Sequence, residues 1–404
     1  MKALHFAPPY RELFSAVVAV AILIVMVVSF HNVALKYSRR AVLPKVSPNY
    51  VDLPDGQHLL SLALASGTTV VIWGSCELTN AEQVPWIAHE FLPKKLNVPV
   101  FAFGHGGMQS LAIAAQMGFY KKYLRNAKQV VILSPEWFNE DEWRVSLDRF
   151  LEFMPTPLLA ELYFESDMND PLRERIGKFL LSQSDQLRDS SFVILALLSD
   201  FGGLKFRFYP TRLLHLAAYL FNYVPAKIND EFALYRLAIK HFQLDGPVRN
   251  GSRFSEAANW DSWQNTARTR ARREITNSYG FFDHYYETIF RDQGPWPRAA
   301  AKPRLSGPEI QDFESMLKLL KEANSHPLFV IQALNPKAFT NVDEYIPLIK
   351  KLVADLDEAG MPILNLWDKD INEPGAFWGP VQTGDLSWLK IDRAILQYVE
   401  RNRE

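Results

Sequence analysis

The sequence predicts an α/β protein built on a parallel sheet with helices packed on both of its faces. Short apolar runs alternate with helical stretches between residues 67 and 138, and the same alternation resumes between 308 and 404. Each apolar run is about as long as a strand that is buried on both faces, roughly four to eight residues. Strands that alternate with helices in this way indicate crossover connections and therefore a parallel sheet.

The chain opens with an uncharged apolar segment, LFSAVVAVAILIVMVVSF, which occupies residues 13–30. Its length lies at the lower edge of a membrane-spanning helix, roughly 17–25 residues. No A-x-A-like cleavage site follows, so a retained anchor over 1–31 is favoured over a secretory signal or a buried helix. Basic residues stand on both sides of the segment and leave its orientation open: Lys2, Arg11, Lys36, Arg39 and Arg40.

A stalk is expected over residues 32–66, where Pro44, Pro48 and Pro54 discourage long helices. The first part of the α/β domain then covers 67–138. Its strands are expected at 67–73, 97–104 and 128–135, with helices opening at Asn80-Ala81-Glu82 and running over 110–127.

Residues 139–307 carry few strand-like runs and several helical stretches, such as PLLAELYF and DEFALYRLAIKHF, so they are expected to form a largely helical insertion. The second part of the α/β domain follows at 308–404. Its expected elements are helices at 308–324, 343–360 and 387–402 and strands at 326–334 and 361–368.

Composition excludes some classes of function. The formal net charge is -1, which gives no electrostatic signal for nucleic acid. Cys76 is the only cysteine, so an intramolecular disulfide and a CxxC metal site are both excluded.

The turn WGSCELTN, residues 73–80, places Cys76 just after the first predicted strand. Ligands of parallel α/β sheets bind at the carboxyl ends of the strands. A helix N-terminus at this point would lower the pKa of a thiol and stabilise an oxyanion, which would suit a nucleophile. A small residue that simply fills a buried turn is the alternative.

The turn FGHGGMQS, residues 103–110, follows the second predicted strand. Gly106 and Gly107 allow close approach of the backbone and free N–H groups, which suits an oxyanion hole, a phosphate or a plain turn. His105 could act as a base beside Cys76, or could be an ordinary solvated loop histidine. After the third strand, SPEWF offers Trp137 and Phe138, which are expected to pack rather than react.

Several of these motifs resemble the DltD proteins. The segments GSCEL, GHGGMQSL and KQVVILSPEWF match that family's G-S-S-E, G-x-G-G-x-Q and S-P-x-W-F patterns, and WDSWQNTARTRARREITNSYGFFDHYY and HPLFVIQALNPKAF match further stretches. EPGAFWGPVQTGDLSWLKID falls without gaps on the pattern E-P-x-x-x-x-D-x-x-H-x-G-W-x-G-W-L-x-x-D. The resemblance covers roughly residues 67–402 in order.

The resemblance implies an SGNH-hydrolase-like α/β fold, one N-terminal membrane helix and a body outside the cytoplasmic membrane. It implies a part in D-alanyl esterification of lipoteichoic or wall teichoic acid, or of a related envelope polymer. The partners implied are a membrane O-acyltransferase and a D-alanyl carrier protein. Neither a metal nor another cofactor is implied.

Carried over residue by residue, the resemblance puts Cys76 at the position of the family's nucleophilic serine. Gly379 and Gln382 stand at the positions of its aspartate and histidine. The surrounding oxyanion and substrate positions are Gly74, Ser75, Glu77, His105, Gly106, Gly107 and Gln109.

A glutamine cannot take up and return a proton as an imidazole does, and a glycine offers no side chain, so the usual triad chemistry is not expected. Three hypotheses about the function of the chain stay open. The chain could assist acylation without its own triad, could use Cys76 as a thiol nucleophile, or could serve as a scaffold or polymer-binding module.

Overall fold

The structure is a computed structural model of the 404-residue chain. It describes residues 8–37, 56–79, 84–139, 145–165, 171–183, 191–200, 211–229, 258–292, 295–367 and 372–401. Three predictions fall outside these residues. They are the stalk between 38 and 55, the helix start at 80–82, and the helix expected within DEFALYRLAIKHF.

The body is organised around a five-stranded sheet in which every described pair of strands is parallel. The strand order is β2-β1-β3-β4-β5. This confirms the predicted α/β class with a parallel sheet. The strands are β1 (Val70–Trp73), β2 (Val100–Phe103), β3 (Lys128–Leu133), β4 (Leu328–Ile331) and β5 (Ile363–Asn365).

The strand order reverses at β1, because the chain steps from β1 to β2 on one side and then returns to β3 on the other. Trp73 at the end of β1 lies opposite Phe103 of β2 and Val131 of β3. A ligand site in such a sheet lies outside the carboxyl ends of the strands at this switch point. The turns that begin at Gly74 and Gly104 occupy that position.

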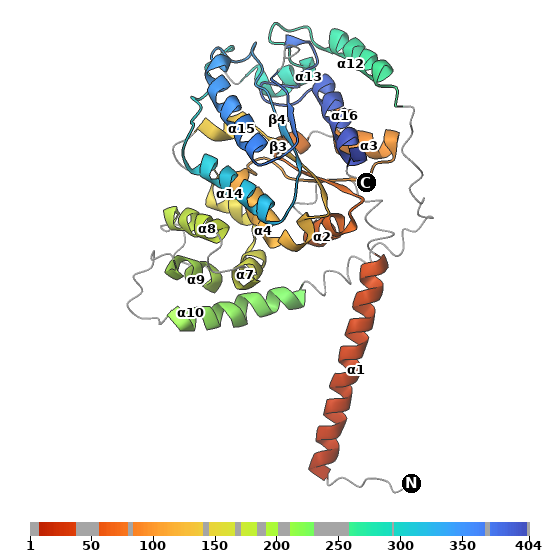
Figure 1. Ribbon diagram of the computed structural model, residues 1–404, viewed down its shortest axis with the longest axis vertical. Coiled ribbons are helices and arrows are strands. Elements are labelled where there is room, and N and C mark those ends of the chain that lie inside the picture. The colour runs from red at the N-terminus through yellow and green to blue at the C-terminus, as the bar shows by residue number, and fades with distance from the viewer. Residues whose placement is uncertain are drawn as a thin grey trace.

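Helices cover both faces of the sheet (Figure 1). The helix after β1 contacts the C-terminal helix, while the helix after β2 packs along the helix that precedes β4. Connections between parallel strands are right-handed. The connection from β1 to β2 crosses the sheet in the opposite direction to the connection from β2 to β3, so the two helix pairs lie on opposite faces. The helices are α3 (Ala88–Leu96) with α16 (Asp385–Arg401), and α4 (Ser110–Phe119) with α14 (Pro308–Glu322). Two further helices are α5 (Lys121–Leu124) and α15 (Ile346–Glu358).

The chain enters the domain earlier than predicted. Helix α2 (Gly56–Ser66) lies within the segment expected to be a stalk, yet Leu60 and Ala63 are fully buried and the helix contacts β1. The expectation of a stalk is therefore wrong for 56–66, because the apolar side chains of this segment contribute to the core of the sheet domain.

Between β3 and β4 the described residues form helices and loops, with one isolated bridge from Arg298 to Phe339. This part begins with η3 (Pro135–Asn139), α6 (Leu147–Phe153), α7 (Thr156–Glu165), α8 (Pro171–Ser182), α9 (Phe192–Asp200) and α10 (Thr211–Ala218). It continues with the π-helical turn η5 (Tyr219–Tyr223), α12 (Trp260–Glu274), α13 (Asp283–Tyr285) and the π-helical turn η6 (Tyr286–Phe290).

Helix α1 (Pro8–Tyr37) covers the segment predicted to be a membrane anchor and projects from the body in Figure 1. Its described apolar side chains are exposed, with Leu13 and Val25 both above 60%. A search of the described residues for a helix long and apolar enough to cross a membrane nevertheless finds none. The structure therefore does not establish the single-pass anchor.

Candidate functional site

The turn after β1 is closed by hydrogen bonds to its own residues and to the turn after β2. The backbone N–H of Gly74 donates to the carbonyl of Phe103 at 3.2 Å, and the Ser75 hydroxyl donates to the carbonyl of His105, also at 3.2 Å. The carboxylate of Glu77 accepts a hydrogen bond from the N–H of Ser75 at 2.6 Å. The two turns that the sequence places at strand ends therefore form one structural unit.

Two glycines make this close approach possible. A Cβ on Gly104 would lie 2.0 Å from the carbonyl oxygen of Gly74, and Gly104 has a φ of +148° that disfavours any other residue. A Cβ on Gly74 would in turn lie 2.3 Å from the carboxylate of Glu77. The main chains of Gly74 and Gly104 are therefore in direct contact, two residues before Cys76 in the chain.

The glycine loop after β2 lies beside Cys76. A Cβ built on Gly106 would be 3.9 Å from the Cβ of Cys76, with no atom nearer. Gly107 has a φ of +96°, and the side chain of Arg149 from α6 lies against it. Gln109 follows at the start of α4 and is buried, and its side-chain oxygen has no hydrogen-bond partner among the described residues. The loop therefore presents backbone groups, rather than bulky side chains, to the thiol.

The thiol of Cys76 is half-buried and strongly disfavours ionisation. Burial raises its pKa to about 12, and the nearby carboxylates of Glu77 and Glu136 raise it further in the same direction. The N–H groups of Cys76 and Glu77 face the sulfur and oppose this shift without overcoming it. The expectation of a lowered thiol pKa is therefore wrong, because burial of the thiol and, to a smaller extent, the charges of Glu77 and Glu136 raise the pKa, while the helix that begins at Cys76 is only three residues long.

Glu77, which the resemblance placed in the nucleophile motif, is buried at 3% exposure. Burial raises the pKa of its carboxyl to about 7, although the hydrogen bond from Ser75 favours the ionised form. The buried carboxyl of Glu77 thus holds the turn closed by accepting the hydrogen bond from Ser75.

The ring of His105 is engaged by groups other than the sulfur. Its Nδ1 lies 3.0 Å from the carbonyl of Gly106, its Nε2 lies 3.8 Å from the carboxylate of Glu152, and the ring packs on Phe153. Helix α6 of the inserted region supplies both of the last two residues. A base role for His105 toward Cys76 stays a prediction.

Sequence reasoning missed Tyr285, which stands between Cys76 and the C-terminal loop. Burial raises the pKa of its phenol to about 12, and negative charge on Cys76 and Glu136 would raise it as well. The side chain of Gln382 hydrogen-bonds the phenol and acts in the opposite direction. Tyr285 therefore stays protonated at neutral pH and lies near both Cys76 and Gln382.

Gly379 lies against the same tyrosine. A Cβ on Gly379 would come within 2.5 Å of Tyr285 Cε1 and within 2.5 Å of the side-chain oxygen of Gln382. That oxygen is buried and has no hydrogen-bond partner among the described residues. The structure thus brings Gly379 and Gln382 together, and the ring of Tyr285 fills the space that an aspartate at 379 would need.

The C-terminal loop is held by the segments that carry the other matching motifs. Phe282 donates its N–H to the carbonyl of Trp378 at 3.3 Å, and Asn335 donates to the carbonyl of Pro380 at 2.9 Å. Arg270 of α12 binds the fully buried carboxylate of Asp385 at 3.1 Å and lies over the ring of Phe282. Helix α12 therefore fixes the position of the loop that carries Gly379 and Gln382.

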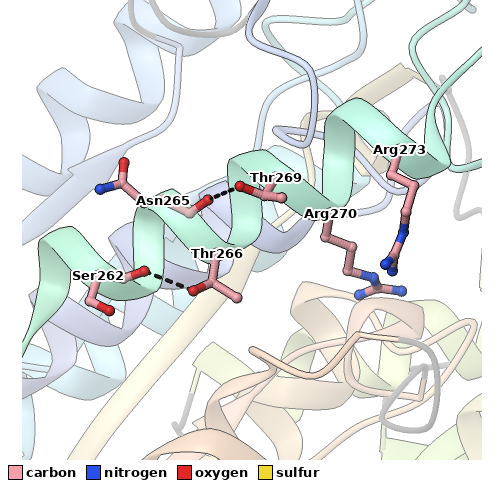
Figure 2. Close-up of a pocket in the computed structure, with 6 residues that line it drawn as sticks. All are labelled: Ser262, Asn265, Thr266, Thr269, Arg270 and Arg273. Atoms are coloured by element: carbon pink, nitrogen blue, oxygen red, sulfur yellow. Dashed lines mark hydrogen bonds between the residues drawn. The ribbon is translucent and has the colours of Figure 1, made fainter.

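The outward side of α12 borders a groove of about 710 Å³ (Figure 2). The hydroxyls of Thr266 and Thr269 donate to carbonyls one turn earlier in the helix. The described residues along the groove are polar or basic: Ser262, Asn265, Thr266, Thr269, Arg270 and Arg273.

Fold and site together define a parallel α/β protein in which a cysteine follows the carboxyl end of β1 and lies next to a glycine loop. The model of the family described as DltD protein matches residues 50–400. The chain therefore belongs to the DltD family.

Two curated relatives agree with this assignment. Protein DltD of Bacillus subtilis (strain 168) is 20% identical over 361 residues, which cover 86% of each chain. Protein DltD of Staphylococcus aureus (strain NCTC 8325 / PS 47) is 22% identical over 342 residues, covering 81% of this chain and 80% of the relative.

Proposed function

We propose that this chain takes part in the D-alanyl esterification of teichoic acid or a related polyol polymer of the cell envelope. Membership of the DltD family supports the pathway. The observation that carries the proposal is the position of Cys76, which lies at the switch point of the sheet beside the Gly106–Gly107 loop. An SGNH-hydrolase type of fold agrees with the parallel sheet and with a nucleophile position directly after β1.

The chemistry proposed is acyl transfer through Cys76 instead of the family's triad. The sulfur attacks the acyl carbonyl of the donor, and its proton passes to the carboxylate of Glu136. Glu136 then gives this proton to the donor's leaving group, which departs as the thioester forms, so that Glu136 is again a carboxylate. A hydroxyl of the polymer then attacks the thioester, forms the ester and returns its proton through Glu136 to the sulfur.

The oxyanion formed in each step needs hydrogen-bond donors. The N–H groups of Cys76 and Glu77 face the sulfur, and the phenol of Tyr285 stays protonated because its pKa is about 12. These groups are proposed to bind the oxyanion. Glu136 is proposed as the base because it is the acid, other than the buried Glu77, that acts on Cys76.

A second candidate function is a non-catalytic scaffold that holds the polymer for a membrane O-acyltransferase. The crowding of Gly379 by Tyr285 favours it, because the usual aspartate has no room. The polar and basic groove along α12 would suit a polyol phosphate chain in either case. A D-alanyl carrier protein is proposed as a further partner, because the resemblance to the DltD family implies one.

The location proposed is the outer face of the cytoplasmic membrane, with α1 as a single-pass anchor. The uncharged run of residues 13–30 and the exposed apolar side chains of α1 support an anchor. The family's substrate lies outside the membrane, which supports an extracytoplasmic body.

The test is complementation of a strain that lacks its own copy of this protein, with ester-linked D-alanine released by mild base as the measurement. The native chain should restore the ester, and Cys76→Ala should not. Cys76→Ser should restore little, since a hydroxyl without an imidazole is a poor nucleophile. Lys95→Ala, on the exposed side of α3, is the matched control.

The outcomes separate the candidates. Full restoration by Cys76→Ala would reject the thiol route and favour the scaffold. No restoration by the native chain would reject a part in this esterification altogether. Hydroxylamine-sensitive acylation of Cys76, seen by mass spectrometry of the intact protein, would support the thioester directly.

A further inference from the structure

An exposed apolar surface runs along α10 and the π-helical turn that follows it. Leu216 is 53% exposed and Phe221 is 65% exposed, although both lie in helical structure. We call this surface the α10 apolar face; its members are Leu213, Leu216, Tyr219, Leu220, Phe221 and Ile228.

The spacing of these residues shows that they form one side of the helix. Leu213, Leu216 and Leu220 are three and four residues apart and therefore line up along the helix. Leu214 and Ala218 are buried, and they lie on the side that packs against α9. The segment thus has two apolar sides. One packs on the body, and the other stays largely exposed, although the rings of Tyr219 and Phe221 contact those of Phe164 and Phe192.

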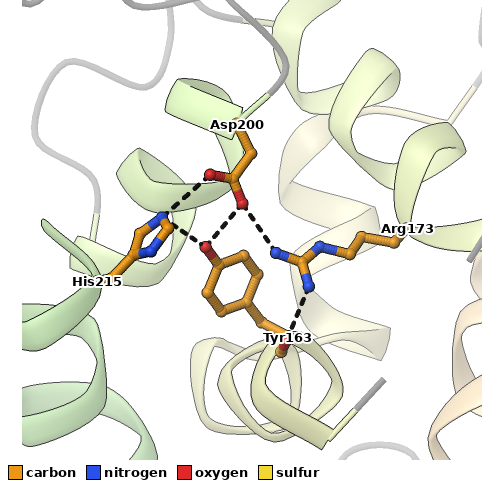
Figure 3. Close-up of polar contacts among 4 residues, drawn as sticks. All are labelled: Tyr163, Arg173, Asp200 and His215. Atoms are coloured by element: carbon orange, nitrogen blue, oxygen red, sulfur yellow. Dashed lines mark hydrogen bonds and ion pairs between the residues drawn. The ribbon is translucent and has the colours of Figure 1, made fainter. Parts of the chain in front are cut away.

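A polar cluster fixes which side faces outward (Figure 3). His215 of α10 lies 3.0 Å from the carboxylate of Asp200 in α9 and 2.9 Å from the hydroxyl of Tyr163 in α7. Arg173 of α8 donates to the same carboxylate at 2.8 Å and is almost fully buried. Since four helices meet at this carboxylate, α10 cannot rotate to bury its exposed side without breaking these bonds.

The α10 apolar face lies at the same end of the molecule as α1, and the axis of α10 runs across that of α1 (Figure 1). A helix that spans a bilayer and a helix that lies flat on its surface are related in this way. Helix α10 therefore lies at the end of the body from which α1 projects.

The charge of the segment also fits a membrane surface. Residues 211–229 contain no aspartate or glutamate. Arg212 is exposed at the start of α10, where a guanidinium can reach lipid phosphates. Tyr219 belongs to the residue types that concentrate at the membrane–water interface.

We propose that α10 and η5 lie in the headgroup region of an anionic phospholipid bilayer, with the α10 apolar face toward the acyl chains. The inference rests on the proposed anchoring by α1 and extends it, because two contacts would fix the tilt of the body where one helix would leave it free. Interfacial binding of this kind follows from buried apolar area together with attraction to anionic lipid.

The experiment uses the full chain with Cys76→Ser, so that a single introduced cysteine can carry an environment-sensitive NBD probe. The probe is placed at Leu216→Cys in vesicles of phosphatidylethanolamine and phosphatidylglycerol. Lipids with a spin label near the headgroup should quench it and its emission should be blue-shifted. Glu358→Cys, exposed at the end of α15, is the matched control and should show neither effect.

A third probe, Val20→Cys in α1, separates this inference from the anchor. Quenching at 20 without quenching at 216 would overturn the inference and leave the anchor standing. Quenching at both positions would support the inference, whereas quenching at 216 alone would reject the anchor and, with it, the arrangement of two membrane contacts. Protection of 216 only after membrane proteins are added would also overturn it, in favour of a protein partner.

Discussion

The ring of Tyr285 occupies the space into which any side chain on Gly379 would have to extend, with 2.5 Å between Tyr285 Cε1 and the position of a Cβ. A residue larger than glycine at position 379 would therefore collide with this ring. Because Tyr285 also hydrogen-bonds Gln382, Gly379 and Gln382 both adjoin the same tyrosine.

This contact predicts strong coupling between the two residues. Gly379→Ala should destabilise the protein by about 1–3 kcal/mol, the usual cost of overpacking. In the background of Tyr285→Ala the same change should cost less, because the ring is gone and the remaining contact is with the end of the Gln382 side chain. Urea unfolding of the four proteins of this double-mutant cycle measures the coupling. Gly106→Ala, where the nearest atom would be 3.9 Å away, is a suitable control, and an equal cost of Gly379→Ala in both backgrounds would refute the steric reading.

The pKa of Cys76 predicts slow alkylation of the folded protein. With a thiol pKa of about 12, instead of its ordinary value of 9.0, little thiolate exists at pH 8. Glu136→Gln removes a negative charge near the sulfur, so the pKa should fall and alkylation by iodoacetamide should accelerate. Mass spectrometry over a pH series gives the rates, and the urea-unfolded chain gives the reference. A fast reaction of the native protein at pH 7 would contradict this prediction.

The buried contact between Arg270 and Asp385 predicts a pH-dependent loss of stability. Burial raises the pKa of Asp385 to about 6, and Arg270 holds it from rising further. Arg270→Leu should therefore raise this pKa and cost about 3–5 kcal/mol at pH 8, where the carboxylate must be charged or must take up a proton. At pH 5 the cost should be smaller, since Asp385 is then protonated more easily. Thermal unfolding at both pH values tests this, with the exposed Arg272→Leu as control; a loss independent of pH would show that packing alone is responsible.

Substitution of the buried Asp392 by asparagine should stabilise the folded protein. Its carboxyl group is fully buried in α16 without a hydrogen-bond partner among the described residues, and burial raises its pKa well above the ordinary value. Above a pH of about 4 the unfolded chain loses this proton while the folded chain keeps it, so folding becomes less favourable as pH rises. Asp392→Asn removes this penalty.

The stability of Asp392→Asn relative to the native chain should therefore increase between pH 5 and pH 8. Urea midpoints at the two pH values measure the difference. The exposed Asp357→Asn should show no comparable trend. A constant difference between Asp392→Asn and the native chain would mean that Asp392 does not hold its proton in the folded state.

The sheet could be predicted from the sequence because its strands are short apolar runs that are buried on both faces. Runs such as VVIW and VFAF carry this signal locally, and all eight of their residues are buried. The helix α2 was missed, although its sequence GQHLLSLALAS is apolar, since the prolines before it suggested an extended approach. A local pattern does not tell which apolar helix will reach the core.

The candidate site could be predicted only in part. The meeting of the Cys76 turn with the Gly106–Gly107 loop follows from parallel strand order, because neighbouring strands end at the same edge. Tyr285 lies far along the chain and reaches the site through the inserted region, so neither spacing nor composition indicates it. The raised thiol pKa also depends on Glu136 arriving from the end of β3, which is a tertiary effect.

The contact between Gly104 and the carbonyl of Gly74 limits which substitutions the two turns can accept. It joins the two turns through their main chains, so the spacing between them does not depend on the side chain carried at position 76. Serine and cysteine can replace each other there without disturbing the scaffold, whereas a single methyl group at 104 would push the turns apart. The side chain at position 76 can thus be exchanged, whereas the main-chain contact beside it cannot be altered without moving both turns.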